Sequence, residues 1–269
     1  MILKNILVHI DSTPRSAVRA EIAARIARAN GGRLTGLFGE KADAHTVGTV
    51  ATWPSEHYAA ALEAARGIFD GAAAPLRDQA AFIDVNRGSE AEISHRFSAI
   101  ARSFDLVVLG QTEDHAPRPA KLPDHVIVES GRPVLVVPYV GQYQTIGKRP
   151  LFAWHGSRGA ARAVSDTLAL LAEDCDGLIV EVGRKNELRD EFADLLVANL
   201  ATHKVKARYQ HFVVDEVNVM DTLLSAVSDH AADLMSIGAF DSGTQALFGH
   251  GAGTRHILAH MTTPVLFSH

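Results

Sequence analysis

The sequence has 269 residues, of which 47% are hydrophobic and 21% are charged, and its formal net charge is -5. This composition supplies enough apolar material for two domain cores and excludes disordered, collagen-like and low-complexity classes. Without a broad basic face, the chain is not expected to bind nucleic acid or anionic membranes non-specifically.

The chain contains one cysteine, Cys175, which excludes an intrachain disulfide and any site that needs several thiolates. We expect it to be a buried, inert thiol. The first residues lack a basic segment followed by a long apolar one, and no apolar run approaches the roughly 18 residues of a membrane span. We therefore expect a soluble, cytoplasmic protein.

In the first half, short apolar runs alternate with segments of helical periodicity. The apolar runs predict strands at 6–10, 34–38, 82–86, 106–109 and 134–137. Helical spacing and capping signals predict helices after Pro14, over 56–80, after Ser89 and shortly before Gly131. Residues 39–55 are less regular and are expected to form a loop.

The same order then begins again. Strands are predicted at 151–154, 178–182, 209–214, 234–237 and 265–267, and helices at 161–171, 187–200, around 220–227 and at 255–260. Two anchors relate the halves: DLVVLG at 105–110 matches DLMSIG at 233–238, and RPVLV at 132–136 matches TPVLF at 263–267. The chain is therefore interpreted as two copies of one strand–helix unit.

These patterns predict an α/β protein with two repeated doubly wound, Rossmann-like domains, each with a mostly parallel five-stranded sheet and helices on both faces. The expected domains are 1–140 and 148–269, separated by a stretch rich in glycine and polar residues. Ligands bind such sheets at the carboxyl ends of the strands, where the strand order reverses. The loops after the first and fourth strands of each half are therefore the candidate sites.

A glycine-rich segment follows the fourth strand of the second half. It runs from Gly238 to Thr254 and leads into the helix at 255–260. Backbone N–H groups at a helix N-terminus bind phosphate, and glycine lets the backbone approach it closely. The Thr254 hydroxyl and the Arg255 charge fit that role. The alternative is a loop of glycine turns with Thr254 as an N-cap, and the residues alone leave both interpretations open.

At this loop the chain resembles a tandem universal stress protein of the UspA type, whose phosphate loop reads G-x2-G-x9-G-[ST]. Gly238 matches the first glycine and Gly251 the third. Asp241 stands at the second glycine, and Ala252 replaces the Ser or Thr. A carboxylate at position 241 repels a polyphosphate unless a metal ion or an outward rotation intervenes.

The run from Gly251 through Gly253 and Thr254 also resembles the variant loop of bacterial two-domain members, in which Thr254 would supply the hydroxyl. The first half lacks the loop, because no glycine occurs between Gly110 and Gly131. The resemblance therefore places nucleotide phosphates in the second domain only.

The resemblance also implies roles for residues outside the loop. Asp11, after the first strand, matches the family's acidic position near adenine and metal, and the second half has His155 at that position. Val182, at the end of a strand, matches the apolar contact to adenine, with an ordinary core residue as the alternative. The last strand of each half, 134–137 and 265–267, is expected to pair with the other in an intramolecular pseudo-dimer. The alternative is pairing between chains in a homodimer.

The resemblance thus implies a stress-response regulatory or binding protein that holds ATP, with Mg²⁺, or another adenine nucleotide in its second domain. The alternative is an interaction protein that binds no nucleotide and uses the pseudo-dimer surface. No catalytic residue is identified, so the strongest activity expected is a weak ATPase. His256 and His260 have the i, i+4 spacing of a metal pair, but no third ligand is evident and no metal site is expected. His9 is expected in the core.

Overall fold

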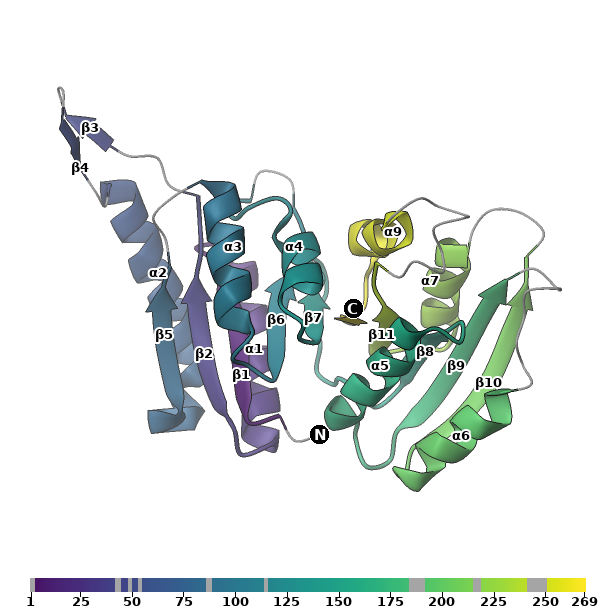
Figure 1. The fold of residues 1–269 in the computed structure, drawn as a ribbon. Helices are drawn as coiled ribbons and strands as arrows, with labels where there is room; N and C mark the ends of the chain where they lie inside the picture. Colours follow the sequence, from purple (N-terminus) through teal and green to yellow (C-terminus); the bar gives the residue numbers. More distant parts are fainter. Residues whose placement is uncertain are drawn as a thin grey trace. The chain divides into compact units, whose positions relative to one another are not determined.

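The computed structural model describes residues 3–41, 45–47, 50–52, 55–85, 89–113, 116–183, 192–214, 219–240 and 251–269. The chain divides into two compact units, Ile2–Val134 and Leu135–His269 (Figure 1). We describe each unit separately.

The first unit alternates strands and helices. Its strands are β1 (Asn5–Ile10), β2 (Arg33–Phe38), β3 (His45–Val47), β4 (Val50–Thr52), β5 (Ala80–Asp84) and β6 (Leu106–Gly110), and β7 (Val134–Val137) begins at the division. Its helices are α1 (Arg15–Ala29), α2 (Glu56–Ala73), the 3-10 helix η1 (Ala74–Gln79), α3 (Glu90–Ala101) and α4 (Leu122–Glu129).

The second unit repeats this order. Its strands are β8 (Pro150–Trp154), β9 (Asp176–Gly183), β10 (Lys206–Val213), β11 (Leu234–Gly238) and β12 (Val265–Ser268). Its helices are α5 (Arg158–Thr167), the 3-10 helix η2 (Leu168–Leu170), α6 (Ala193–Thr202), α7 (Val219–Asp229) and α9 (Ala252–His260).

The two sheets have the same strand order. In the first unit, β1 pairs in parallel with both β2 and β6, and β2 pairs in parallel with β5. In the second unit, β8 pairs in parallel with both β9 and β11, β9 with β10, and β11 with β12. The order therefore reverses between β1 and β6, and again between β8 and β11. This common topology confirms the predicted duplication of a doubly wound α/β unit.

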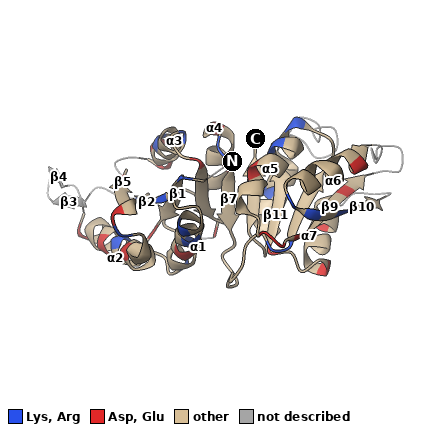
Figure 2. Ribbon diagram, turned by 90° about the horizontal axis from the view of Figure 1, so that it is seen from below, with Lys and Arg blue, Asp and Glu red and all other residues tan. Residues whose placement is uncertain are grey.

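Helices cover both faces of each sheet. In the first unit α1 packs beside α2 and α3 packs beside α4, and these two pairs lie on opposite faces of the sheet (Figure 2). The central strands β1 and β6 are apolar runs with almost no exposed surface, as expected for a sheet covered on both sides. In the second unit α5 and α6 lie on one face and α7 on the other (Figure 2).

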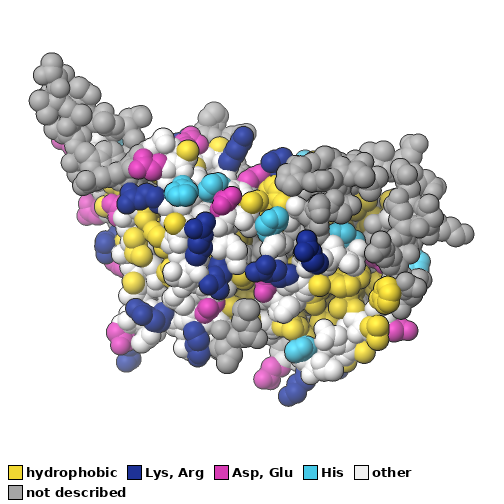
Figure 3. Space-filling model, in the orientation of Figure 1, with side chains coloured by type: hydrophobic (Ala, Val, Ile, Leu, Met, Phe, Trp, Pro, Cys, Tyr) yellow, Lys and Arg dark blue, Asp and Glu magenta, His cyan; other side chains and the backbone are white. Residues whose placement is uncertain are grey.

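The second unit leaves part of its apolar surface exposed. Figure 3 shows hydrophobic side chains gathered on the side where α6 lies. Phe192, the N-cap of α6, is 51% exposed, and Leu195 on that helix is 67% exposed.

Several predicted boundaries differ from the structure. The helix predicted over 56–80 ends at Ala73, because Pro75 lacks an N–H and the chain continues as a 3-10 helix with Arg77 at φ 52°. The segment predicted as a loop over 39–55 contains the antiparallel pair β3 and β4. The strand predicted from residue 209 begins three residues earlier, since β10 spans Lys206–Val213.

Candidate functional site

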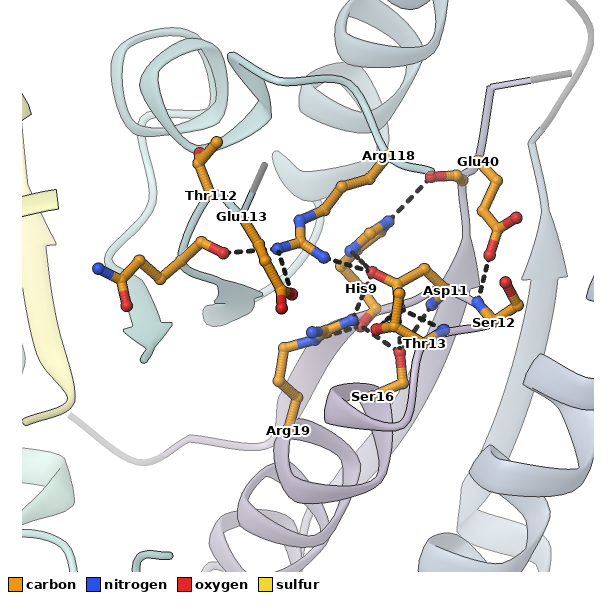
Figure 4. Close-up of polar contacts among 12 residues, drawn as sticks. His9, Asp11, Ser12, Thr13, Ser16, Arg19, Glu40, Thr112, Glu113 and Arg118 are labelled. Atoms are coloured by element: carbon orange, nitrogen blue, oxygen red, sulfur yellow. Dashed lines mark hydrogen bonds and ion pairs between the residues drawn. The ribbon is translucent and has the colours of Figure 1, made fainter. Parts of the chain in front are cut away.

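The carboxyl end of β1 carries a buried ion cluster centred on Asp11 (Figure 4). Its Oδ2 accepts hydrogen bonds from Arg19 Nη2 and from Arg118 Nη1, each at 2.8 Å. Its Oδ1 accepts from Ser16 Oγ at 2.8 Å and from the backbone N–H of Thr13 at 3.0 Å. Both carboxylate oxygens of Asp11 are therefore used within the protein.

Three elements bring these side chains together. Asp11 follows β1, whereas Ser16 and Arg19 are three residues apart on α1 and so face the same way. Arg118 comes from the segment between β6 and α4, and its Nη2 also donates to the Gln111 carbonyl at 2.5 Å. Asp11 is 0% exposed, Arg19 2% and Arg118 3%, so the cluster is closed to solvent.

Burial alone would raise the pKa of Asp11, since it disfavours the charged carboxylate. The positive charges of Arg19 and Arg118 outweigh burial and hold the pKa of Asp11 well below its usual range. The carboxylate is therefore ionised at neutral pH. This pairing satisfies the requirement that a charge inside a protein have an opposite charge and hydrogen bonds.

His9 lies beside the cluster in β1 and is fully buried, as predicted. Burial is the main reason why its pKa is lowered to about 4, and the nearby Arg19 acts in the same direction. The Gly39 carbonyl can only accept, so the neutral ring donates from Nε2 to it at 3.0 Å. Nδ1 then carries a lone pair, 3.8 Å from Asp11 Oδ2, and has no hydrogen-bond partner among the described residues.

Gly110, the last residue of β6, makes room for this cluster. A Cβ at this position would lie 2.6 Å from Arg19 Nη1. Because β1 and β6 flank the point where the strand order reverses, the Arg19 side chain occupies the place where doubly wound sheets bind ligands. The first unit fills this place with its own side chains.

The second unit is built differently at the equivalent point. His155 follows β8 and is half-buried. A Cβ on Gly238, at the end of β11, would lie 2.6 Å from the carbonyl carbon of Gly159 in α5. Here the backbone of the helix itself approaches the strand. Ala163 has the same spacing from His155 that Arg19 has from Asp11, so no arginine stands at that position.

The first turn of α9 is tied to the chain that leaves β11. Thr254 is 6% exposed, and its Oγ1 accepts from the backbone N–H of Phe240 at 2.9 Å. Gly251, the N-cap of α9, has φ +75°, and a Cβ there would lie 2.5 Å from the Phe240 ring. Glycine is thus required at position 251, both for its backbone conformation and for this close approach.

Other predicted residues lie around the same helix. Gly253 packs against Met220, whose Cε would be 2.7 Å from an added Cβ, and Ala252 is the first residue of α9. The guanidinium of Arg255 stands 5.7 Å from the centre of the Phe240 ring. Gly238, Gly251, Ala252, Gly253 and Thr254 are thus gathered at the carboxyl end of β11, where α9 begins (Figure 1).

The remaining predicted residues belong to other elements of the second unit. Val182 is partly exposed near the end of β9, in register with Phe212 of β10. Asp241 lies outside the described residues. The three predicted roles of Asp241, His155 and Val182 toward a nucleotide therefore stay predictions.

The buried arginines were missed from sequence. Arg19 lies one position from Val18, on a helix that we interpreted through its apolar residues, and arginine is rarely buried without a partner. The available signal was a polar run, Asp11 to Thr13, followed by Ser16 and Arg19 within two helical turns. Nothing in the sequence marks Arg118 as the second partner.

The histidine pair on α9 has other partners. His256 Nε2 lies 2.6 Å from Asp221 Oδ1, and His260 Nδ1 donates to the His256 carbonyl at 2.9 Å. In the part of the chain that the structure describes, no three His, Cys, Asp or Glu side chains are arranged to hold a metal ion. In that same part, no helix combines the length and apolar character needed to cross a bilayer. Cys175 is buried, as predicted.

The fold and the two points where the strand order reverses define a tandem doubly wound α/β protein. In this class two Rossmann-like units share one chain. No family model matches the sequence, and no curated protein does. Among solved structures, a universal stress protein from Archaeoglobus fulgidus DSM 4304 is similar, with a TM-score of 0.73 and 13% identity over 99% of this chain and 97% of that one.

A functionally unknown protein from Pseudomonas aeruginosa PAO1 is also similar, with a TM-score of 0.57 and 14% identity over 99% of this chain and 92% of that one. At such low identity the likeness concerns the fold. The chain thus has the fold of the universal stress proteins over nearly its whole length, which confirms the resemblance noted in the sequence at the level of the fold.

Proposed function

We propose that this chain is a cytoplasmic stress-response binding protein that holds ATP or another adenine nucleotide in its second predicted domain, residues 148–269. The observation that carries the proposal is the hydrogen bond from Phe240 to Thr254, 2.9 Å long, which holds the first turn of α9 at the carboxyl end of β11. The free N–H groups of a helix's first turn bind phosphate, and this end of the sheet is where such folds place ligands.

The charges around α9 agree with an anionic ligand. Arg255 lies in the first turn, and the N-terminus of the helix carries a partial positive charge. Glycines at 251 and 253 let the Phe240 ring and the Met220 side chain pack closely against the first turn of α9, which fixes the position of that turn. In the proposal the phosphates contact this turn, and Thr254 anchors the turn to the chain that leaves β11. The adenine lies toward Val182 and His155.

The described residues supply no carboxylate for Mg²⁺ where the family resemblance expects one. The residue after β8 is His155, and Mg²⁺ prefers oxygen ligands. We therefore expect Mg²⁺ to be held mainly by the phosphates of the nucleotide. Its part would be to offset their charge.

Isothermal titration with ATP, ADP and AMP, with and without Mg²⁺, tests the proposal. We expect binding that weakens in Arg255→Ala and that loses little in Thr263→Val. The latter is a control in the same unit, because Thr263 bonds to Ala232 at the opposite end of the sheet. No heat for any nucleotide would reject the proposal and favour an interaction protein that binds none.

A further inference from the structure

Two guanidinium groups converge on one carboxylate in the core of the first unit. Arg19 Nη2 and Arg118 Nη1 both lie 2.8 Å from Asp11 Oδ2, and they approach from different elements (Figure 4). Proteins commonly bind anionic oxygens with converging arginines, because each guanidinium combines a positive charge with directed N–H groups.

The cluster also contains neutral donors to the same carboxylate. Ser16 Oγ and the backbone N–H of Thr13 donate to Oδ1 at 2.8 and 3.0 Å. Together with the arginines they surround both oxygens. This set of donors is that of an anion site, in which the anion is a side chain of the protein itself.

The cluster lies where a ligand binds in other doubly wound sheets. It fills the point between β1 and β6 where the strand order reverses, and Gly110 provides the space for Arg19. Arg118 also donates to the carbonyl of Gln111, the residue that follows β6, so one guanidinium links the ends of β1 and β6.

We propose that the first unit is a self-liganded anion site: the Asp11 carboxylate takes the place of a ligand's anionic group, and Arg118 closes the site over it. The unit is thereby closed to nucleotides and other oxyanions. This inference concerns the first unit and does not depend on nucleotide binding by the second.

Removal of the carboxylate tests the proposal by creating a vacancy for a small anion. In the full chain, Asp11→Ala leaves two buried guanidinium groups without their counter-charge, and we expect its Tm to fall by about 10 °C. Sodium formate, titrated against sodium chloride at equal ionic strength, should raise the Tm of this variant by about 3 °C at tenfold its Kd. The wild-type chain should show no such formate-specific rise.

A matched control is available in the second unit. Asp166 is also a buried carboxylate, but it accepts from the Ser268 hydroxyl at 2.8 Å rather than from a pair of arginines. Asp166→Ala should therefore show no formate-specific rise. The double variant Asp11→Ala/Arg118→Ala should lose the response as well, because one of the two guanidinium groups that would hold formate is absent.

If Asp11→Ala fails to fold, Asp11→Gly and Asp11→Asn extend the test. The glycine variant leaves the vacancy and should respond to formate, whereas the asparagine amide fills it and should not. A folded Asp11→Ala or Asp11→Gly chain that formate does not stabilise more than chloride overturns the proposal. Two nucleotides bound per wild-type chain would overturn it too, whereas no bound nucleotide would contradict only the proposed function of the second unit.

Discussion

Arg118 and Asp11 are 107 residues apart in the chain, and their side chains meet at 2.8 Å inside the first unit. The contact joins the segment after β6 to the end of β1, so it links the two strands that flank the point of reversed order. A long-range ion pair of this kind is costly to break once it is buried, because each charge has given up its water.

Loss of Arg118 should therefore destabilise the chain strongly. In Arg118→Ala, Asp11 keeps one guanidinium and the Gln111 carbonyl loses its donor. We expect the free energy of unfolding to fall by about 3–5 kcal/mol in urea denaturation. The control is Lys41→Ala, which removes an exposed pair with Glu90 at 3.1 Å and should cost less than about 1 kcal/mol. Equal losses in the two variants would contradict the role given to Arg118.

The stability of the first unit should depend on pH through His9. The pKa of His9 is lowered from 6.5 in the unfolded chain to about 4 in the folded protein. Between these values the unfolded chain binds more protons, so stability falls as the pH is lowered. The loss from this residue should approach about 3 kcal/mol by pH 4, since one pKa unit is worth about 1.4 kcal/mol.

Urea denaturation at a series of pH values checks this prediction. His9→Gln keeps an N–H donor for the Gly39 carbonyl and cannot titrate, so its stability should fall less than that of the wild type over this range. His57→Gln, at an exposed position on α2, should follow the wild type. A His9→Gln chain with the wild-type pH slope would show that another group is responsible.

A second, acid-side loss is expected from Asp11. Its pKa is depressed in the folded protein, so its contribution is present above the unfolded value and is lost as the pH falls below about 4. Asp11→Asn should remove this part of the acid dependence. If the wild type and Asp11→Asn lost stability in parallel below pH 4, the buried pairing would not account for acid unfolding.

Gly251→Ala should weaken both the fold and nucleotide binding. The alanine must adopt φ +75°, and its Cβ would lie 2.5 Å from the Phe240 ring, so α9 has to shift. We expect a loss of about 2 kcal/mol or more in stability, measured by thermal unfolding, with weaker ATP binding by calorimetry.

Gly131→Ala separates the effect of backbone strain from that of the clash with the Phe240 ring. Gly131 has φ +63°, but nothing lies within 4 Å of the position of its added Cβ. It should therefore show the backbone strain alone, about 1 kcal/mol, and leave nucleotide affinity unchanged. Comparable losses of affinity in both glycine variants would contradict a local role for position 251.

Thr254→Val should cost about 1–3 kcal/mol, because it leaves the buried N–H of Phe240 without an acceptor while keeping the shape of the side chain. ATP affinity should fall as the first turn of α9 loses its anchor. Thr254→Ser keeps the acceptor and should retain most of both. Denaturation and calorimetry on the two variants decide the matter: equal affinities would mean that the hydroxyl does not organise the site.

The fold follows from local patterns in the sequence. The apolar runs of β1 and β6, the helical spacing between them and the repeated DLVVLG and DLMSIG segments predict two doubly wound units, and the strand pairing agrees. Boundaries were less accurate where one residue decides them, as at Pro75, or where the strands of a hairpin are only three residues long, as at β3 and β4.

The candidate site was predicted only in part. Gly238, Gly251 and Thr254 lie together because glycine and a capping hydroxyl are local signals at a strand end and a helix start. The Asp11 cluster depends on a partner from the distant segment after β6. A single sequence carries no signal for such a contact, and the usual preference of arginine for the surface points the wrong way.

The glycines that end β6 and β11 have a consequence for how interchangeable the two copies are. At Gly110 an arginine side chain acts as a spacer between helix and strand, whereas at Gly238 the main chain of α5 rests directly on the strand. A chimaera with α5 in place of α1 would leave a hollow under the helix, and the reverse exchange would force a guanidinium into a space already taken. The two units have the same topology, but their first helices cannot be exchanged.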